Sequence, residues 1–423
     1  MTARFAYVPM ASTLHDREAL NRLIADYVPP LAQLGAERLA PTGAGAAQPL
    51  IVFVVTGGTE QSILELWEDR TETAPGEPLI LLAHPGHNSL PASLEALARL
   101  HQLGAAGRII YLQGPDDQNG LELLREAIAD LQVRRALREV RIGLVGPPSD
   151  WLVASSPNPG VVREVWGPHV VPIDLDAVYE QFRSVADPAP MAAELIDHAE
   201  AMLEASPAEV DEAARFAAAL RSVVADQHLD AVTVRCFDVI EALGTSGCMA
   251  LSRLNDDGVI AGCEGDLVST VGMIWVDRLL GILPWMANPA RLDVEANTVW
   301  LAHCTVPRSL VESFSIRSHF ESGMGVGIEG RFPGGPVTLL RIGGTAMDRL
   351  WAAEGEILQT GSDPSLCRTQ IEVRLGGEKV SDLLEAPLGN HLIVVTGHHR
   401  KRLEHWQSTM VPEHLTLASA PQP

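Results

Sequence analysis

Residues 50–56 read Leu-Ile-Val-Phe-Val-Val-Thr, an almost unbroken run of β-branched and aliphatic side chains. Such a run predicts a strand that is covered on both faces by other elements. Similar runs recur at 4–10, 79–83 and 108–112, and stretches with helical periodicity alternate with them at 15–35, 59–69, 89–103 and 119–132. Alternating strands and helices favour a parallel sheet with right-handed crossovers. We therefore expect an open α/β domain over residues 1–138.

The same alternation continues beyond this point and predicts a central α/β domain over residues 139–284. Strands are expected at 140–145 and 231–234, and the stretch 266–280 is apolar nearly all round, which predicts a buried helix. After residue 284 the character changes. Short strand-like runs separated by Gly and Pro follow one another closely, which is typical of a sandwich or barrel; they lie at 297–304, 324–330, 335–343, 369–374 and 391–396. The expected fold class is thus α/β, with two open parallel-sheet domains followed by a mainly β, barrel-like domain at 285–423.

The composition excludes some classes of partner. The chain of 423 residues has 31 basic and 54 acidic residues and a formal net charge of −23. Such a charge argues against nucleic acid and anionic membranes as partners. We find no apolar run of about 18 residues and no basic start followed by an apolar core, so we expect neither a membrane span nor a signal peptide. The five cysteines are odd in number and lack CxxC spacing, which favours reduced thiols in a cytoplasmic protein.

The first candidate site residue is Glu264, in the segment Cys-Glu-Gly-Asp at 263–266. Acidic residues at a helix start often act as caps, and this reading suits Asp266. Glu264 instead ends an apolar strand, and ligands gather at the carboxyl ends of strands in open α/β sheets. The sequence leaves both roles open for Glu264, a site residue or a satisfied cap.

Further polar candidates lie in the last third of the chain. Asn288 stands in Trp-Met-Ala-Asn-Pro at 285–289, His303 ends a strand, and His391 opens one. A lone histidine in such a place is more often structural than ligating. A glutamate, a second oxygen donor and histidines would nevertheless suit Mn²⁺ or Mg²⁺ better than a thiolate site would.

Two N-terminal loops are weaker candidates. Thr59 belongs to Thr-Gly-Gly-Thr-Glu at 56–60, between a strand and a helix, and Asn88 belongs to His-Pro-Gly-His-Asn-Ser at 84–89. A turn of this kind can present backbone N–H groups to a ligand. A plain structural turn is the competing interpretation of each loop, and we favour it.

An ordered set of short motifs adds a resemblance to this reading. The motifs are Val-Arg-Cys-Phe at 234–237, Gly-Cys-Met-Ala-Leu-Ser-Arg-Leu-Asn at 247–255, Cys-Glu-Gly-Asp at 263–266, Met-Ala-Asn-Pro at 286–289, Ala-His-Cys at 302–304, His-Phe-Glu-Ser-Gly at 319–323 and Gly-Asn-His at 389–391, with Thr-Gly-Gly-Thr-Glu at 56–60 and Pro-Ser-Asp-Trp-Leu at 148–152 earlier in the chain. With these motifs the chain resembles the L-fucose isomerase and L-arabinose isomerase family, in particular its fucose isomerase-like branch. The resemblance implies an aldose–ketose isomerase of the cytoplasm that uses a divalent metal, usually Mn²⁺, and assembles into trimers or hexamers.

The resemblance also assigns residues. Glu264 matches the first metal carboxylate, His391 matches the late histidine ligand, and His303 matches a further ligand position of L-arabinose isomerases. His303, His319 and Glu321 are the implied contacts to a small-molecule sugar. In this family the first domains of neighbouring subunits contribute to each other's sites, a purpose that the loops of Thr59 and Asn88 could serve.

One departure from the family pattern matters. Asn288 stands where the second carboxylate is expected, and an asparagine cannot accept a proton at neutral pH. Isomerisation moves a proton between adjacent carbons, and two carboxylates normally share the acid and base roles in this transfer. Glu264 could do the proton work alone, or Asp293 or Glu321 could take over the missing role. A shifted match around 286–293 would instead make Asp293 the true ligand. Alternatively the protein is a sugar-binding or regulatory protein on the same scaffold, or an enzyme of another class such as an epimerase or aldolase.

Overall fold

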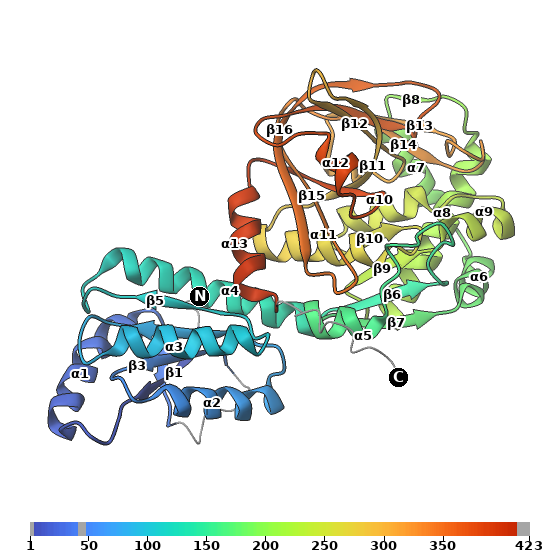
Figure 1. Ribbon diagram of the computed structural model, residues 1–423. Helices are drawn as coiled ribbons and strands as arrows, with labels where there is room; N and C mark the ends of the chain where they lie inside the picture. Colours follow the sequence, from blue (N-terminus) through green and yellow to red (C-terminus); the bar gives the residue numbers. More distant parts are fainter. Residues whose placement is uncertain (1–3, 41–47, 413–423) are drawn as a thin grey trace, which may run out of the picture. The chain divides into compact units, whose positions relative to one another are not determined.

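The structure, a computed structural model, describes residues 4–40 and 48–412 (Figure 1). The chain divides into two compact units, residues 1–136 with 405–423, and residues 137–404. The outer ends of the predicted domains, at 1–3 and 413–423, lie outside the described residues. Within the part of the chain that is described, no helix has the length and apolar character needed to cross a membrane.

The first unit contains the parallel sheet that the apolar runs predict. Its five strands follow the order β2-β1-β3-β4-β5 and all pair in parallel. All five residues of β3 are buried, because helices cover both faces of the sheet. The strands are β1 (Phe5–Met10), β2 (Ala36–Arg38), β3 (Leu50–Val54), β4 (Leu79–Ala83) and β5 (Gly107–Tyr111), and the helices are α1 (Arg17–Gln33), α2 (Glu60–Thr73), α3 (Ser89–Gln102) and α4 (Gln118–Glu139).

The second unit begins with another parallel sheet, in the order β10-β9-β6-β7. Its strands are β6 (Arg141–Val145), β7 (His169–Ile173), β9 (Ala231–Val234) and β10 (Ile260–Cys263). The connecting helices are α5 (Pro159–Val161), η2 (Val162–Trp166), α6 (Leu175–Ser184), α7 (Ala189–His198), α8 (Pro207–Asp226), α9 (Cys236–Leu243), α10 (Cys248–Asp256) and α11 (Leu267–Leu280). The predicted α/β alternation is therefore confirmed in both units.

The same unit continues into a closed antiparallel barrel, β11-β12-β17-β16-β15-β18. Every second residue of a strand fills its interior, as Val299, Leu339, Val373 and Val394 do. The barrel confirms the predicted β-rich part, whereas the division at residue 284 stays a prediction. Its strands are β11 (Trp285–Asp293), β12 (Thr298–His303), β15 (Gly335–Gly343), β16 (Arg349–Gly361), β17 (Thr369–Leu375) and β18 (Leu392–Thr396).

Smaller elements complete the chain. A short sheet joins β14 (Gly327–Arg331), β13 (Ser313–Arg317) and β8 (Ala201–Met202). The remaining helices are η3 (Arg308–Leu310), α12 (Asp382–Glu385) and α13 (Arg400–Met410).

The buried helix α11 links the parallel sheet to the barrel. It packs against β9 and β10 on one side and against β15 and β18 on the other (Figure 1). Its first ten residues are all buried, as the all-round apolar sequence predicts. A Cβ on Gly272 would collide with Ile393 of β18, so this glycine allows the helix and the barrel to approach closely. The N-terminus of α11 thereby comes to lie beside the start of β18.

Candidate active site

The carboxyl ends of three parallel strands meet at one edge of the second sheet. Val145 of β6, Val234 of β9 and Cys263 of β10 lie in one register across the sheet. The segments that follow these strands therefore leave the sheet side by side, where open α/β sheets hold their ligands. Glu264 directly follows β10, and the segment with Trp151 follows β6.

Glu264 occupies an unusual backbone position. Its φ of 62° is left-handed, which L-residues other than glycine rarely adopt. Its carbonyl oxygen accepts a hydrogen bond of 2.9 Å from the Ser149 N–H, and the Gly265 N–H donates to the Val234 oxygen at 3.0 Å. Asp266, not Glu264, is the cap of α11, because its side chain accepts from the Ser269 N–H. The cap reading is thus removed for Glu264, and strain of this kind is concentrated at functional sites.

Glu264, His303 and His391 form a compact cluster. Each offers one ligand atom, and these atoms all lie within 4.8 Å of one another. Glu264 Oε1 lies 3.8 Å from His391 Nε2, and the two imidazole rings meet edge to face at 5.7 Å between centroids. Three segments that are far apart in sequence thus converge on one point, as the resemblance implies.

The barrel places Asn288 next to this cluster. Strand β11 lies between β12, which ends in His303, and β18, which His391 precedes. Ala287 pairs with Leu392, so Asn288 and His391 are the next residues along that antiparallel ladder. Residues that face each other in such a ladder point to the same side of the sheet. The Asn288 Oδ1 atom is buried and has no hydrogen-bond partner among the described residues, as is true of His391 Nε2.

A buried charge network holds His391 from behind. Its Nδ1 lies 2.8 Å from Asp266 Oδ2, and the Arg341 guanidinium contacts the same carboxylate oxygen at 3.2 Å. Arg341 also donates a 2.6 Å hydrogen bond to Ser155 Oγ. Asp266 and His391 are completely buried, and Arg341 is 1% exposed. This network directs the free nitrogen of His391 toward Glu264, as a carboxylate does behind a metal-binding histidine.

The protonation states follow from these contacts. Burial alone would lower the pKa of His391, but the carboxylates of Asp266 and Glu264 outweigh it and raise the pKa to about 9. Burial, together with the charge on His391, lowers the pKa of His303 to about 4. Burial would raise the pKa of Glu264, but its contacts with His391 and Trp151 outweigh this and lower it. Near neutral pH, His391 is therefore charged, His303 is neutral and Glu264 is ionised.

The other predicted contacts are spread over two regions. His319 is 7% exposed, and its ring meets Phe237 edge to face at 5.5 Å between centroids, on the side of the site where Trp151 lies. Glu321 is exposed in the turn after β13. Asp293 is exposed at the far end of β11, where it accepts a 2.9 Å hydrogen bond from the Ala296 N–H and stabilises the turn. The structure therefore does not bring Asp293 to the cluster.

Trp151 is a site residue that the sequence reasoning did not single out. Its indole Nε1–H donates a 2.6 Å hydrogen bond to Glu264 Oε2. The available signal was the segment Pro-Ser-Asp-Trp-Leu at 148–152 directly after a predicted strand, since such loops carry ligand contacts. Asp266 was likewise read only as a cap, although it also holds His391.

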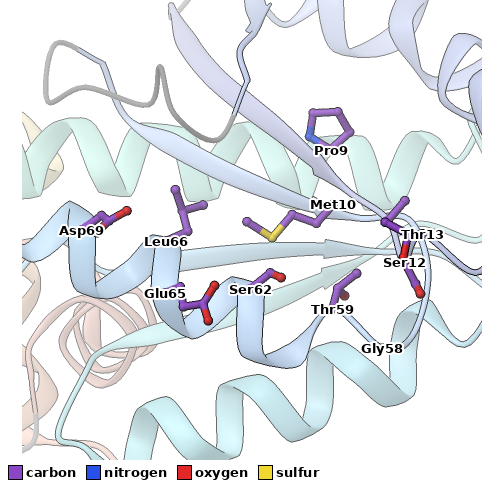
Figure 2. Close-up of a pocket in the computed structure, with 11 residues that line it drawn as sticks. Pro9, Met10, Ser12, Thr13, Gly58, Thr59, Ser62, Glu65, Leu66 and Asp69 are labelled. Atoms are coloured by element: carbon purple, nitrogen blue, oxygen red, sulfur yellow. The ribbon is translucent and has the colours of Figure 1, made fainter.

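The weaker N-terminal candidates belong to the first unit. A cavity of about 450 Å³ lies at the ends of β1 and β3, where the strand order of the sheet reverses. Thr59 lines it, and Figure 2 shows Ser12, Thr13 and Thr59 gathered at one end, with Glu65 and Asp69 further along α2. Asn88 has a left-handed φ of 58° and precedes α3, but it is not among the residues that line this cavity.

A second acidic cluster in the first unit has a simpler explanation. Glu126, Asp130 and His405 also bring ligand atoms within 4.8 Å of one another. Arg108 lies among them and forms a 3.2 Å ion pair with Asp130, besides contacting His405. A guanidinium in this position compensates the negative charge, so the cluster is an ion-pair network around the buried Asp130.

Comparison with known proteins gives relatives of one kind. No protein-family model matches the chain. It is 25% identical over 252 residues to a sulfoquinovose isomerase of Alkalicoccus urumqiensis, a match that covers 58% of this chain and 57% of that protein. It is 25% identical over 296 residues to a sulfoquinovose isomerase of Priestia megaterium, covering 67% of this chain and 66% of that protein. A segment of 104 residues is 32% identical to a sulfoquinovose isomerase of Clostridium sp..

These matches span less than two thirds of the relatives' own lengths. The relatives are sugar isomerases by name, which is compatible with the expected resemblance to L-fucose and L-arabinose isomerases. At this level of identity they support the class of protein and leave its particular activity to be argued from the site.

Proposed function

We propose that this protein is a sugar isomerase that interconverts an aldose and its ketose, and that the aldose is either a plain or a modified sugar. The observation that carries the proposal is the convergence of Glu264, His303 and His391 within 4.8 Å at the carboxyl end of a parallel sheet. An ionised carboxylate beside two imidazoles suits both proton transfer and metal binding. The relatives named sulfoquinovose isomerases support the same reaction class.

The donor set fits a divalent cation such as Mn²⁺ or Mg²⁺. Glu264, His391 and Asn288 would hold it, as the resemblance implies, with His303 as a further ligand. Asn288 Oδ1 and His391 Nε2 support this fit, because both atoms are buried without a hydrogen-bond partner among the described residues, and buried polar atoms usually have one. When bound, the cation would stabilise the negative charge that develops on the two sugar oxygens during enolisation.

Glu264 is the group that would move the proton. Its lowered pKa keeps it ionised near neutrality, ready to accept a proton from the carbon next to the carbonyl. Asn288 can hold a hydroxyl group but cannot take a proton, and Asp293 lies at the far end of β11. We therefore propose that Glu264 removes the proton from C2 and returns it to C1 by itself, while the hydroxyl proton passes from O2 to O1.

Nuclear magnetic resonance of sugar turnover tests this proposal. Protein supplied with Mn²⁺ is incubated with L-fucose, L-arabinose and sulfoquinovose, and we expect one of them to yield its ketose. Glu264→Gln should abolish turnover, whereas Asp293→Asn, a matched change in an exposed turn of the same unit, should not. With an aldose deuterated at C2, a single base should carry part of the label to C1. Turnover by Glu264→Gln at the normal rate would contradict the assignment.

One observation favours a second candidate function. Asn288 removes a carboxylate that the reaction normally uses, so the same scaffold could bind a sugar without converting it. That function predicts a rise in melting temperature with sugar and no product after long incubation. Appearance of ketose would exclude it.

We also propose that the protein is a homo-oligomer, a trimer or hexamer, in which the loops of Thr59 and Asn88 serve a neighbouring site. The cavity beside Thr59 lies where the strand order of the first sheet reverses, a place where ligands bind in such sheets. Light scattering tests the assembly. A mass near three or six times 45.4 kDa is expected, and a monomer would contradict it.

A further inference from the structure

Trp151 is held in a fixed orientation, although 51% of the residue is exposed. Arg235 donates a 2.7 Å hydrogen bond to the Pro148 oxygen and pairs with both oxygens of Asp150 at 3.2 Å, which fixes the segment before the tryptophan. Phe237 meets the indole edge to face at 4.9 Å between centroids, with an angle of 84°. An aromatic pair of this geometry contributes specific stabilisation beyond the burial of area.

The indole N–H distinguishes the two oxygens of Glu264. It donates to Oε2 at 2.6 Å, while Oε1 faces His391 Nε2 at 3.8 Å. Hydrogen bonds to a carboxylate are short and strong when the acceptor is ionised, as Glu264 is. The carboxylate plane is therefore set by the tryptophan on one side and by the imidazole on the other.

The half-exposed indole ring borders Glu264. Its nitrogen is in direct contact with Oε2, so the ring stands beside the carboxylate that faces the histidine cluster. A sugar has apolar C–H groups that gain from leaving water against an aromatic face. Trp151 thus presents two chemistries at one place, a donor for the carboxylate and an apolar wall for the sugar.

From these contacts, and resting on the proposed function, we propose that Trp151 both positions Glu264 and forms the apolar wall that contacts the carbon skeleton of the sugar. It is a positioning residue through its N–H and a specificity-determining residue through its ring. The two roles are separable, because phenylalanine keeps an aromatic ring and lacks the N–H, whereas alanine lacks both.

The experiment compares Trp151→Phe, Trp151→Ala and Val153→Ala, measuring kcat and KM for the sugar and the affinity for Mn²⁺ by electron paramagnetic resonance. Val153 is 90% exposed in the same loop, which makes it a matched control. We expect Trp151→Phe to lower kcat and Mn²⁺ affinity about tenfold and to leave KM little changed. Loss of a group that holds a metal ligand typically costs about 10- to 100-fold, so this is the lower end of that range. Trp151→Ala should in addition raise KM about tenfold. Val153→Ala should behave as the unaltered protein.

Each role has its own refutation. Normal kcat and Mn²⁺ affinity in Trp151→Phe would overturn the positioning role, and equal KM values for the two tryptophan variants would overturn the apolar wall. If the unaltered protein converts no sugar, the proposed function fails. The Mn²⁺ affinity of Trp151→Phe then still decides the positioning role, and quenching of tryptophan fluorescence by bound sugar, absent in Trp151→Ala, decides the wall. Melting curves confirm that the variants are folded.

Discussion

The buried histidine His391 makes the stability of the metal-free protein depend on pH. In the folded chain its pKa is about 9, against an ordinary value of 6.5. A raised pKa means that the stabilisation is fully present below pH 6.5 and is lost as the pH rises through about 9. One pKa unit corresponds to about 1.4 kcal/mol, so this difference stabilises the fold by about 3 kcal/mol at low pH.

Metal and proton should compete for the same nitrogen. Near neutrality His303, with a pKa of about 4, and ionised Glu264 carry no proton that the ion would displace. Only His391 has to lose a proton before it can bind the ion. The dissociation constant for Mn²⁺ should then fall about tenfold for each pH unit up to about pH 8 and level off above about pH 9. Between pH 7 and pH 9 the affinity should rise about 50-fold, and at pH 7 about one proton should be released for each ion bound.

Urea unfolding in the presence of a chelator measures the first effect, and titration calorimetry in two buffers of different ionisation enthalpy measures the second. His391→Gln is the control, because it removes the titrating group and should abolish both pH dependences. An Mn²⁺ affinity that is flat between pH 7 and pH 9 would refute the reasoning. So would a His391→Gln variant that loses as much stability as the unaltered protein when the pH rises from 6.5 through 9.

Three further predictions concern the surroundings of this histidine. Asn288→Asp should tighten Mn²⁺ binding about tenfold in calorimetry, since it adds a charged oxygen ligand; unchanged affinity would show that residue 288 does not reach the ion. Arg341→Met leaves Asp266 buried without its guanidinium and should cost about 3–5 kcal/mol in urea unfolding, and a loss below about 1 kcal/mol would contradict this. The Cys236 and Cys263 sulfur atoms lie 2.9 Å apart, so peroxide should join them in a disulfide that lowers the thiol titre of the unfolded chain from five to three and that Cys236→Ser prevents; a titre of five after treatment would speak against it.

The parallel strands could be predicted from sequence because both of their faces are covered. All residues of β3, β4, β9 and β10 are buried, and apart from Thr233 in β9 each reads as a continuous run without polar side chains. The expectations at 79–83 and 231–234 agree with the observed parallel strands at both ends, and so does that at 335–343 with the antiparallel barrel strand β15. In these places local sequence and three-dimensional burial carry the same information.

The strands that the sequence reasoning did not predict have one exposed face or an interruption. β16 alternates between buried and exposed residues and contains glycine and several charges. β11 includes Pro289, next to which its register with β12 shifts. Proline and bulges weaken the local strand signal, so only pairing with neighbouring strands identifies these segments.

The site itself was only partly predictable, because its contacts depend on register between distant segments. The motifs suggested Glu264, His303 and His391, which the structure brings together. The contact between Asp266 and His391 joins residues 125 positions apart, and that between Trp151 and Glu264 joins residues 113 apart. Neither contact follows from spacing or periodicity. The first requires that the end of β10 meets the start of β18, and the second requires that the ends of β6 and β10 meet.

Charge gives a physical reason for an asparagine at position 288. In the metal-free site the ionised Glu264 and Asp266 balance the charges of Arg341 and protonated His391. If a divalent cation replaced the proton, the same groups would carry one net positive charge, which a carboxylate at position 288 would cancel. An amide there keeps that charge available for the negative charge of an enediolate or of an anionic sugar. An amide at position 288 would thus lower the affinity for the ion and strengthen the attraction of the negatively charged reacting species, because buried charges interact strongly.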